Sequence, residues 1–113
     1  YSKFRVGAAL RAGDGSIHGG CDVETAAYPQ GLCAEAGAIS ALVAAGHKQI
    51  LECVVVGPGP EVITPCGGCR QKLREFAADD VPVHLCGPDG LHRTVTLGQL
   101  LPMSFGPQHF AQP

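Results

Sequence analysis

The sequence predicts an α/β protein with one mixed sheet and helices packed against it. Strand and helix signals follow one another in the order β-β-α-β-α-β-β, which is typical of such a sheet. Residues 51–56 form a valine-rich run that is apolar except for Glu52, and it predicts a central strand buried on both faces. The 113 residues, 45% of them hydrophobic, fit one domain spanning residues 1–113.

The first third of the chain predicts a hairpin followed by a loop. Residues 4–12 predict a strand, residues 13–16 carry a Gly-Asp-Gly-Ser turn signal, and residues 16–24 return as a second strand. Residues 25–32 contain a proline and a glycine and predict a loop.

The rest of the chain predicts two helices and several shorter elements. Residues 33–45 are rich in alanine, with Leu and Ile at helical spacing, and Gly46 closes this helix. A second helix is expected to open at Pro65 and to run to about residue 78, because a proline at a helix start needs no N–H. The remaining expected elements are a strand at 82–86, a turn at 87–90, a strand at 91–96, a helical turn at 97–101 and a loose tail at 106–113.

Charge and composition disfavour several classes of partner. The formal net charge is −2 and aromatic residues make up 5%, so the chain has little cationic surface for a long nucleic acid. A small, weakly charged molecule suits this balance better. No apolar run is long enough to span a membrane. Because the chain starts at Tyr1 without an initiator Met, we expect an N-terminal segment to be missing from it.

Cysteine usage indicates a reducing compartment, the cytoplasm. No signal peptide is visible, and several of the six cysteines lie in apolar runs, as buried free thiols do. We therefore expect metal-bound and free thiols and no disulfide framework. The expected structural thiols are Cys21, Cys53 and Cys86, and the five histidines are given no ligand role.

Two short motifs carry the chemistry. Cys33-Ala-Glu35 opens the Ala-rich helix, and Pro65-Cys-Gly-Gly-Cys69 opens the next one. A helix N-terminus favours the thiolate that zinc needs, and the spacing of Cys66 and Cys69 lets both sulfurs reach one metal. Cys33 can complete the ligand set from the neighbouring helix.

This arrangement favours a catalytic zinc site over a structural one. Three protein ligands leave a fourth position for water, and a metal-bound water loses its proton near neutral pH. Glu35 lies two residues after a ligand, where its carboxylate can move protons. The same pattern, including the flanking proline, is the general signature of zinc deaminases of nucleobases. A lone Cys-x-x-Cys would also suit a redox pair or a structural zinc site, and a lone helix glutamate is most often a solvated carboxylate.

Five blocks along the chain resemble the small, homotetrameric cytidine deaminases. They are Tyr1-Ser-Lys-Phe-Arg-Val-Gly-Ala-Ala-Leu10, Gly20-Cys-Asp-Val-Glu24, Cys33-Ala-Glu35, Pro65-Cys-Gly-Gly-Cys-Arg-Gln71 and Leu100-Leu-Pro-Met-Ser-Phe105. The resemblance implies a three-layer fold, with a mixed five-stranded sheet and helices on both faces, and a further helix before Tyr1. It implies one Zn²⁺ per chain and hydrolysis of cytidine and 2′-deoxycytidine to the uridine product and ammonia, as in pyrimidine salvage. It also implies a homotetramer with shared active sites.

The resemblance also assigns roles in substrate binding. Phe4 would lie against the pyrimidine, and Asp22 and Glu24 would bind the ribose hydroxyls. Tyr28 would line the site, and the backbone of Ala34 together with Glu35 would recognise the base edge. Phe105 would come from a neighbouring subunit to close the pocket.

Two positions depart from the family pattern. Asp22 stands where the family commonly has Asn, so it can accept a hydrogen bond from a ribose hydroxyl but cannot donate one as an amide does. Ala36 stands where many relatives with three cysteine ligands have an arginine that offsets thiolate charge. The helix N-termini or Arg70 would have to offset the negative charge of the thiolates instead.

Three other functions remain open from the sequence. One is deamination of a modified cytidine or a blasticidin-like nucleoside by the same fold, which Asp22 and Ala36 leave possible. Another is a zinc-binding module without catalysis. The third, editing of a nucleic acid, is disfavoured by the short chain and its acidic balance.

Overall fold

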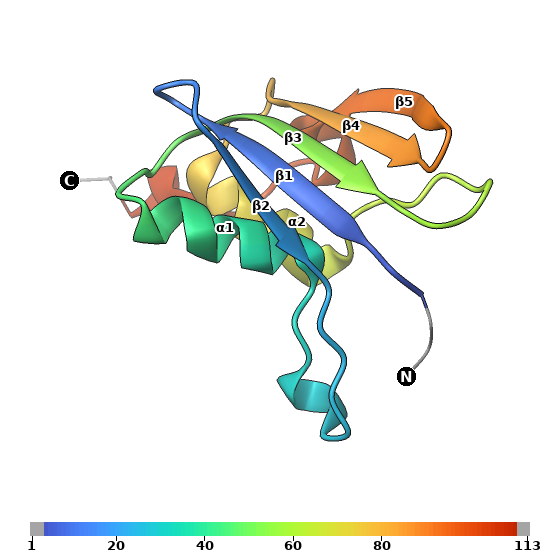
Figure 1. Ribbon diagram of the computed structural model, residues 1–113. Helices are drawn as coiled ribbons and strands as arrows, with labels where there is room; N and C mark the ends of the chain where they lie inside the picture. Colours follow the sequence, from blue (N-terminus) through green and yellow to red (C-terminus); the bar gives the residue numbers. More distant parts are fainter. Residues whose placement is uncertain (1–3, 111–113) are drawn as a thin grey trace.

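The computed structural model describes residues 4–110 and contains a mixed sheet of five strands in the order β2–β1–β3–β4–β5 (Figure 1). The strands are β1 Gly7–Ala12, β2 Ile17–Cys21, β3 Ile50–Val56, β4 Pro82–Gly87 and β5 Gly90–Thr96. β3 and β4 pair in parallel and the other neighbours pair antiparallel, which confirms the predicted mixed sheet with helices. Residues 1–3 of the first resemblance block and residues 111–113 of the predicted tail lie outside the described residues.

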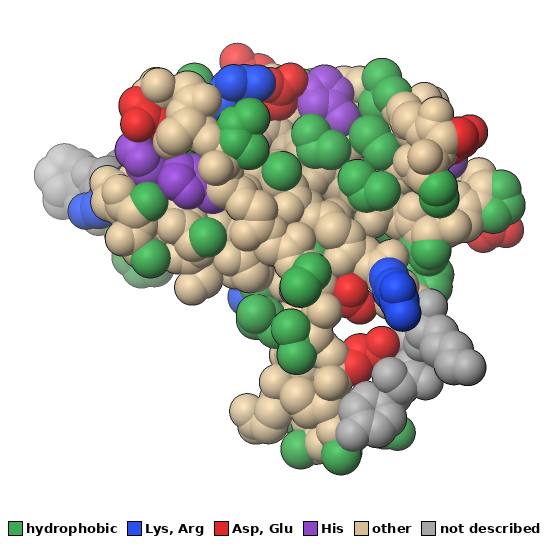
Figure 2. Space-filling model, viewed as in Figure 1, with side chains coloured by type: hydrophobic (Ala, Val, Ile, Leu, Met, Phe, Trp, Pro, Cys, Tyr) green, Lys and Arg blue, Asp and Glu red, His purple; other side chains and the backbone are tan. Residues whose placement is uncertain are grey.

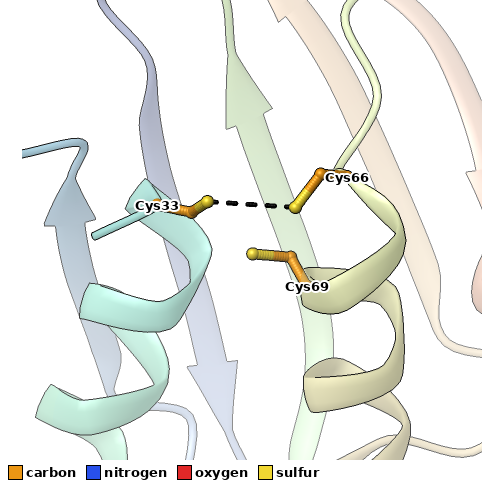
Figure 3. A group of neighbouring side chains, drawn as sticks. All are labelled: Cys33, Cys66 and Cys69. Carbon is orange, nitrogen blue, oxygen red and sulfur yellow. Dashed lines mark hydrogen bonds between the residues drawn. The ribbon is translucent and has the colours of Figure 1, made fainter. Parts of the chain in front are cut away.

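Two helices, α1 Ala34–Ala44 and α2 Gly67–Phe76, pack side by side against one face of this sheet (Figures 1 and 3). A third, α3 Leu97–Leu100, follows β5, and short 3₁₀ helices lie at Tyr28–Gln30 and Pro107–His109. The prediction of a loose tail is wrong for 106–110, because Gly106 is buried and hydrogen bonds close a turn there. The start of α2 also differs: Cys66 is the N-cap, so Pro65 precedes the helix.

The core lies between the sheet and the two helices. Leu10, Val55 and Leu85 project from the sheet onto Leu42 of α1 and Leu73 of α2, and all five side chains are buried. β3 was predicted to be buried on both faces, but in the described chain only the helix-facing side is fully covered. Among residues 4–110, no helix has the length and apolar character that a membrane crossing requires.

The face of the sheet away from the helices carries a polar network. Glu52 of β3 accepts from Arg11 Nε at 3.0 Å and pairs with His84 Nε2 at 2.6 Å. Thr94 Oγ1 lies 2.9 Å from the other ring nitrogen of His84, His84 Nδ1. The arginine and the histidine both hold the pKa of the Glu52 carboxyl below its usual value, with His84 contributing most. These cross-strand contacts help to fix the register of four strands.

Small residues allow α1 to lie close to β2, and this closeness sets the height of Cys33 above the sheet. A Cβ atom added at Gly20 would clash with the Ala38 nitrogen and would lie 2.6 Å from the Ala34 oxygen. These are backbone atoms, which cannot move aside as a flexible side chain could. Gly20 is therefore required by the contact between β2 and α1.

We predict that Gly20→Ala destabilises the protein by about 1–3 kcal/mol, the usual cost of overpacking a tight contact. Urea denaturation of the purified protein measures the change. Gly19→Ala is the matched control, because a Cβ there would approach only the Ala8 oxygen at 3.6 Å, an ordinary contact. Equal stabilities for the two variants would contradict the role given to Gly20.

Candidate metal centre

Three thiols from two helices converge at one end of the α1–α2 pair (Figure 3). Cys33 is the N-cap of α1, Cys66 is the N-cap of α2, and Cys69 lies in the first turn of α2. The sulfur atoms of Cys33 and Cys66 are 3.8 Å apart, and all three sulfurs lie within 4.8 Å of one another. The predicted convergence at two helix N-termini is therefore confirmed.

The three thiols differ in how readily they ionise. Burial raises the pKa of Cys69 well above its ordinary range, and burial also raises the pKa of Cys33. The pKa of Cys66 is lowered, chiefly because the backbone N–H of Cys69 donates to its sulfur. Cys66 is thus the thiol that ionises first, and a bound metal must displace protons from the other two.

The donor set fits zinc. Zinc accepts soft thiolate ligands, and sulfurs spaced within 4.8 Å can share one ion. Cys33 and Cys66 are exposed and border a cavity, so the ligands are accessible from that side. A zinc ion held by these three thiolates would keep one further ligand position open to a molecule in the cavity.

Glu35 lies beside the thiols as the second residue of α1, and its side chain is only 4% exposed. Burial is the largest cause of the raised pKa of Cys69, and the negative charge of Glu35 is the second largest. Burial also raises the pKa of Cys53 to about 12, and the charge of Glu35 adds to that rise. Glu35 borders the same cavity, of about 230 Å³, as Cys33 and Cys66. The cavity is also lined by Phe4, Val6, Asp22, Ala34, Ile63 and Thr64.

Four residues predicted for the site, Phe4, Asp22, Ala34 and Glu35, therefore line one cavity with two of the thiols. Sequence reasoning missed Val6, Ile63 and Thr64. For Ile63 and Thr64 the available signal was their position just before Pro65, because a chain that leads into a metal ligand also lines the space beside it.

A second cavity, of about 370 Å³, adjoins the first and is lined by Glu24, Tyr28 and other residues of the arm, which we define as residues 22–33. The two cavities share Asp22 and Cys33. The arm projects away from the body of the protein (Figure 1) and is closed at its base by paired hydrogen bonds between Val23 and Leu32. Figure 2 shows acidic side chains close to where the arm meets the body.

Asp22 is braced against the start of β1. Its backbone N–H donates to the Val6 oxygen at 3.1 Å, and its carboxylate Oδ1 accepts from the Val6 N–H at 2.9 Å. One carboxylate oxygen thus holds the segment that carries Phe4. This contact joins residues 16 positions apart and has no signal in the local sequence.

Three predicted residues lie apart from these cavities. Phe105 is 58% exposed, stacks on His109 with ring centroids 4.9 Å apart, and belongs to neither lining. Ala36 is half-buried in the first turn of α1 and offers no donor from its side chain. Arg70 directs its guanidinium to three oxygen atoms of the backbone and of Thr64.

A three-thiol zinc centre open to a cavity, with a buried carboxylate beside it, defines a class of hydrolytic zinc enzymes. Residues 1–85 match the model of the family described as "Cytidine and deoxycytidylate deaminase zinc-binding region". The chain belongs to this family, and its cofactor is zinc.

Curated and solved relatives agree with this assignment. A cytidine deaminase of Sporosarcina psychrophila is 41% identical over 93% of this chain and 77% of its own length. One from Mycobacterium tuberculosis is 39% identical over 94% of this chain and 76% of its own. The crystal structure of a cytidine deaminase from Burkholderia pseudomallei superposes with a TM-score of 0.86 at 40% identity, covering 93% of this chain and 84% of that one.

We predict that removing any of the three thiols releases the metal. Wild-type protein should hold one zinc per chain, whereas Cys66→Ala and Cys69→Ala should hold almost none, as measured by elemental analysis after dialysis. A chelator should lower the melting temperature of the wild type, because zinc at 100 times its Kd stabilises the folded state by about 2.7 kcal/mol. Cys21→Ala is the control, since Cys21 lies outside the cluster. Full zinc in Cys69→Ala would refute the assignment.

Proposed function

We propose that this chain deaminates cytidine and 2′-deoxycytidine by hydrolysis, giving the uridine product and ammonia. The observation that carries the proposal is the cavity shared by Glu35, Cys33 and Cys66. The names of the similar proteins, cytidine deaminases from several bacteria, support the same reaction. Other reactions of the fold, including those on modified cytidines, have no observation in their favour.

The reaction needs a proton carrier beside the metal. When bound, zinc makes the attacking water acidic enough to act as a nucleophile near neutral pH. The Glu35 carboxylate would accept one proton of that water and deliver it to the ring nitrogen, and it would then carry the second proton, from the hydroxyl now bonded to the ring carbon, to the departing amine. The water oxygen becomes the carbonyl oxygen of the product, and the amine leaves as ammonia. Because Glu35 is buried, little bulk water competes for these proton transfers.

The first cavity supplies groups that would hold the base. Phe4 offers an aromatic face at the side of the pocket, and Ala34 is the first residue of α1. The N–H groups of a first helical turn have no acceptor within the helix, so they can donate to a polar base edge. The aromatic wall and the helix N-terminus together suit a flat, polar ring.

The second cavity would hold the sugar and favours a neutral nucleoside over a nucleotide. Asp22 and Glu24 both line it, and carboxylates accept hydrogen bonds from sugar hydroxyls. The same two charges repel a phosphate group. Within a family described by both cytidine and deoxycytidylate, this acidic lining supports the nucleoside as the substrate.

We further propose a homotetramer in which Phe105 acts in a neighbouring active site. Phe105 borders neither cavity of its own chain, and it lies exposed with Met103 and Phe110. An apolar group of this kind is typical of a surface that another subunit covers. A reducing compartment, the cytoplasm, is also proposed, because zinc-binding thiols and three further free thiols must stay reduced. Thiol titration in intact cells measures that state.

We predict that Glu35→Gln abolishes turnover while zinc and fold remain, because the amide cannot carry the proton. The loss should be at least about 10²-fold, the low end for a general acid–base group. Ammonia release and loss of ultraviolet absorbance from cytidine give the rate, and elemental analysis gives the zinc content.

A panel of substrates distinguishes the proposed activity from the alternative functions. Cytidine and 2′-deoxycytidine should be processed, and deoxycytidylate should be poor. If the protein turned over a blasticidin-like nucleoside but not cytidine, the proposed substrate would be wrong. Zinc-loaded wild-type protein that turns over no aminopyrimidine nucleoside would indicate a binding module without catalysis.

The tetramer makes a separate prediction. Sedimentation equilibrium should give four times the 11.6 kDa chain mass. Phe105→Ala should lose activity and keep its zinc, and subunits of Phe105→Ala mixed with subunits of Glu35→Gln should regain part of it, because some sites then combine an intact Glu35 with a neighbour's Phe105. A monomer mass, or mixtures that stay inactive although the subunits exchange, would contradict shared sites.

A further inference from the structure

Arg70 follows the metal ligand Cys69 directly, and its side chain is tied at three points. Nε donates to the Pro65 oxygen at 2.7 Å, Nη1 donates to the Leu100 oxygen at 2.8 Å, and Nη2 donates to Thr64 Oγ1 at 2.9 Å. A planar guanidinium with several fixed donors can satisfy three acceptors at once, which a lysine cannot.

Two of these acceptors belong to the loop that leads into Cys66. Among the described residues, no loop hydrogen bond between backbone groups begins or ends at residues 58–65. Pro65 has no N–H to donate, and Cys66 has an extended backbone without a side-chain cap. The guanidinium therefore supplies the hydrogen bonds that hold this loop next to α2.

The third acceptor anchors the guanidinium to the C-terminal part of the chain. Leu100 ends α3, where carbonyl groups lack partners within the helix. Two more side chains of α2 hold the segment that follows: Gln71 donates to the Phe105 oxygen and Arg74 donates to Ser104. Of these three side chains, Arg70 is the one that also contacts the loop before Cys66.

We propose that Arg70 is a positioning residue that fixes the Thr64–Pro65 backbone and so places the Cys66 sulfur opposite Cys33. The proposal rests on the zinc site of the proposed function. It differs from compensation of thiolate charge, because the three donors described point to oxygen atoms. The two roles are separable: a positively charged lysine would preserve compensation but not the three directed hydrogen bonds.

The experiment compares Arg70→Lys and Arg70→Ala with two control variants. Lys72→Ala removes one positive charge from the exposed side of the same helix, and Arg74→Ala releases Ser104 without touching the loop. Zinc affinity is measured by chelator competition on the full chain. Cobalt substituted for zinc reports ligand geometry through its sulfur charge-transfer and visible bands.

Both Arg70 variants should bind zinc about 10–100-fold more weakly than the wild type, the range for residues that orient metal ligands. Their cobalt spectra should shift, and both control variants should match the wild type. Thr64→Val removes one of the three acceptors, so it should show a smaller loss of the same sign; it serves if Arg70→Ala fails to fold.

If Arg70→Lys kept the zinc affinity and the cobalt spectrum of the wild type, the positioning role would be overturned in favour of charge compensation. Equal losses in Arg74→Ala would also overturn it, because the effect would then arise from the C-terminal segment. If wild-type protein binds zinc and turns over cytidine while the Arg70 variants match it, this proposal alone fails. If wild-type protein binds no zinc, the proposed function fails with it.

Discussion

The convergence of three thiols from two helices is the constraint on which the rest of the structure depends. Cys33 and Cys66 lie 33 positions apart, yet their sulfurs are 3.8 Å apart. This requires the N-termini of α1 and α2 to sit at the same height above the sheet. Gly20 allows the close approach of α1, and Leu73 anchors α2 in the core. The packing of the sheet therefore determines the ligand geometry, which the cysteines alone could not hold.

Charge balance follows from that geometry. A divalent zinc with three thiolates carries a net negative charge, and the nearby Glu35 adds to it. Ala36 contributes no charge, and Arg70 directs the donors described to oxygen atoms. The groups left to stabilise the thiolates are the N–H groups and dipoles of two helix N-termini, such as the Cys69 N–H that donates to Cys66. Such partial charges offset less than a full arginine charge, so water bound there would be less acidic than at a site with an arginine in place of Ala36.

The sequence predicted most of the elements and the three thiols that converge, because these depend on local patterns. Valine runs, the Ala-rich helix and the Cys-x-x-Cys spacing each occupy a few consecutive residues. What it could not predict depends on contacts between distant segments. The Asp22–Val6 brace and the Arg70–Leu100 contact join strands and loops through tertiary packing. The second face of β3 was misjudged because apolar composition reports what a strand can bury, whereas the cover it receives depends on other segments.

The difference between local patterns and distant contacts also separates the type of reaction from the choice of substrate. Short motifs contain Cys33, Glu35, Cys66 and Cys69, so the local sequence predicts the type of reaction. In the proposed function the substrate would be selected largely by the arm, which joins the body at Asp22 and Cys33 and is closed by one bridge at its base. Tyr28 at its tip is 78% exposed in the single chain, and an arm with so few buried contacts is held weakly by its own chain. In the proposed tetramer a neighbouring subunit would cover such side chains. Substrate recognition would then depend on assembly, while the metal centre would form within each chain.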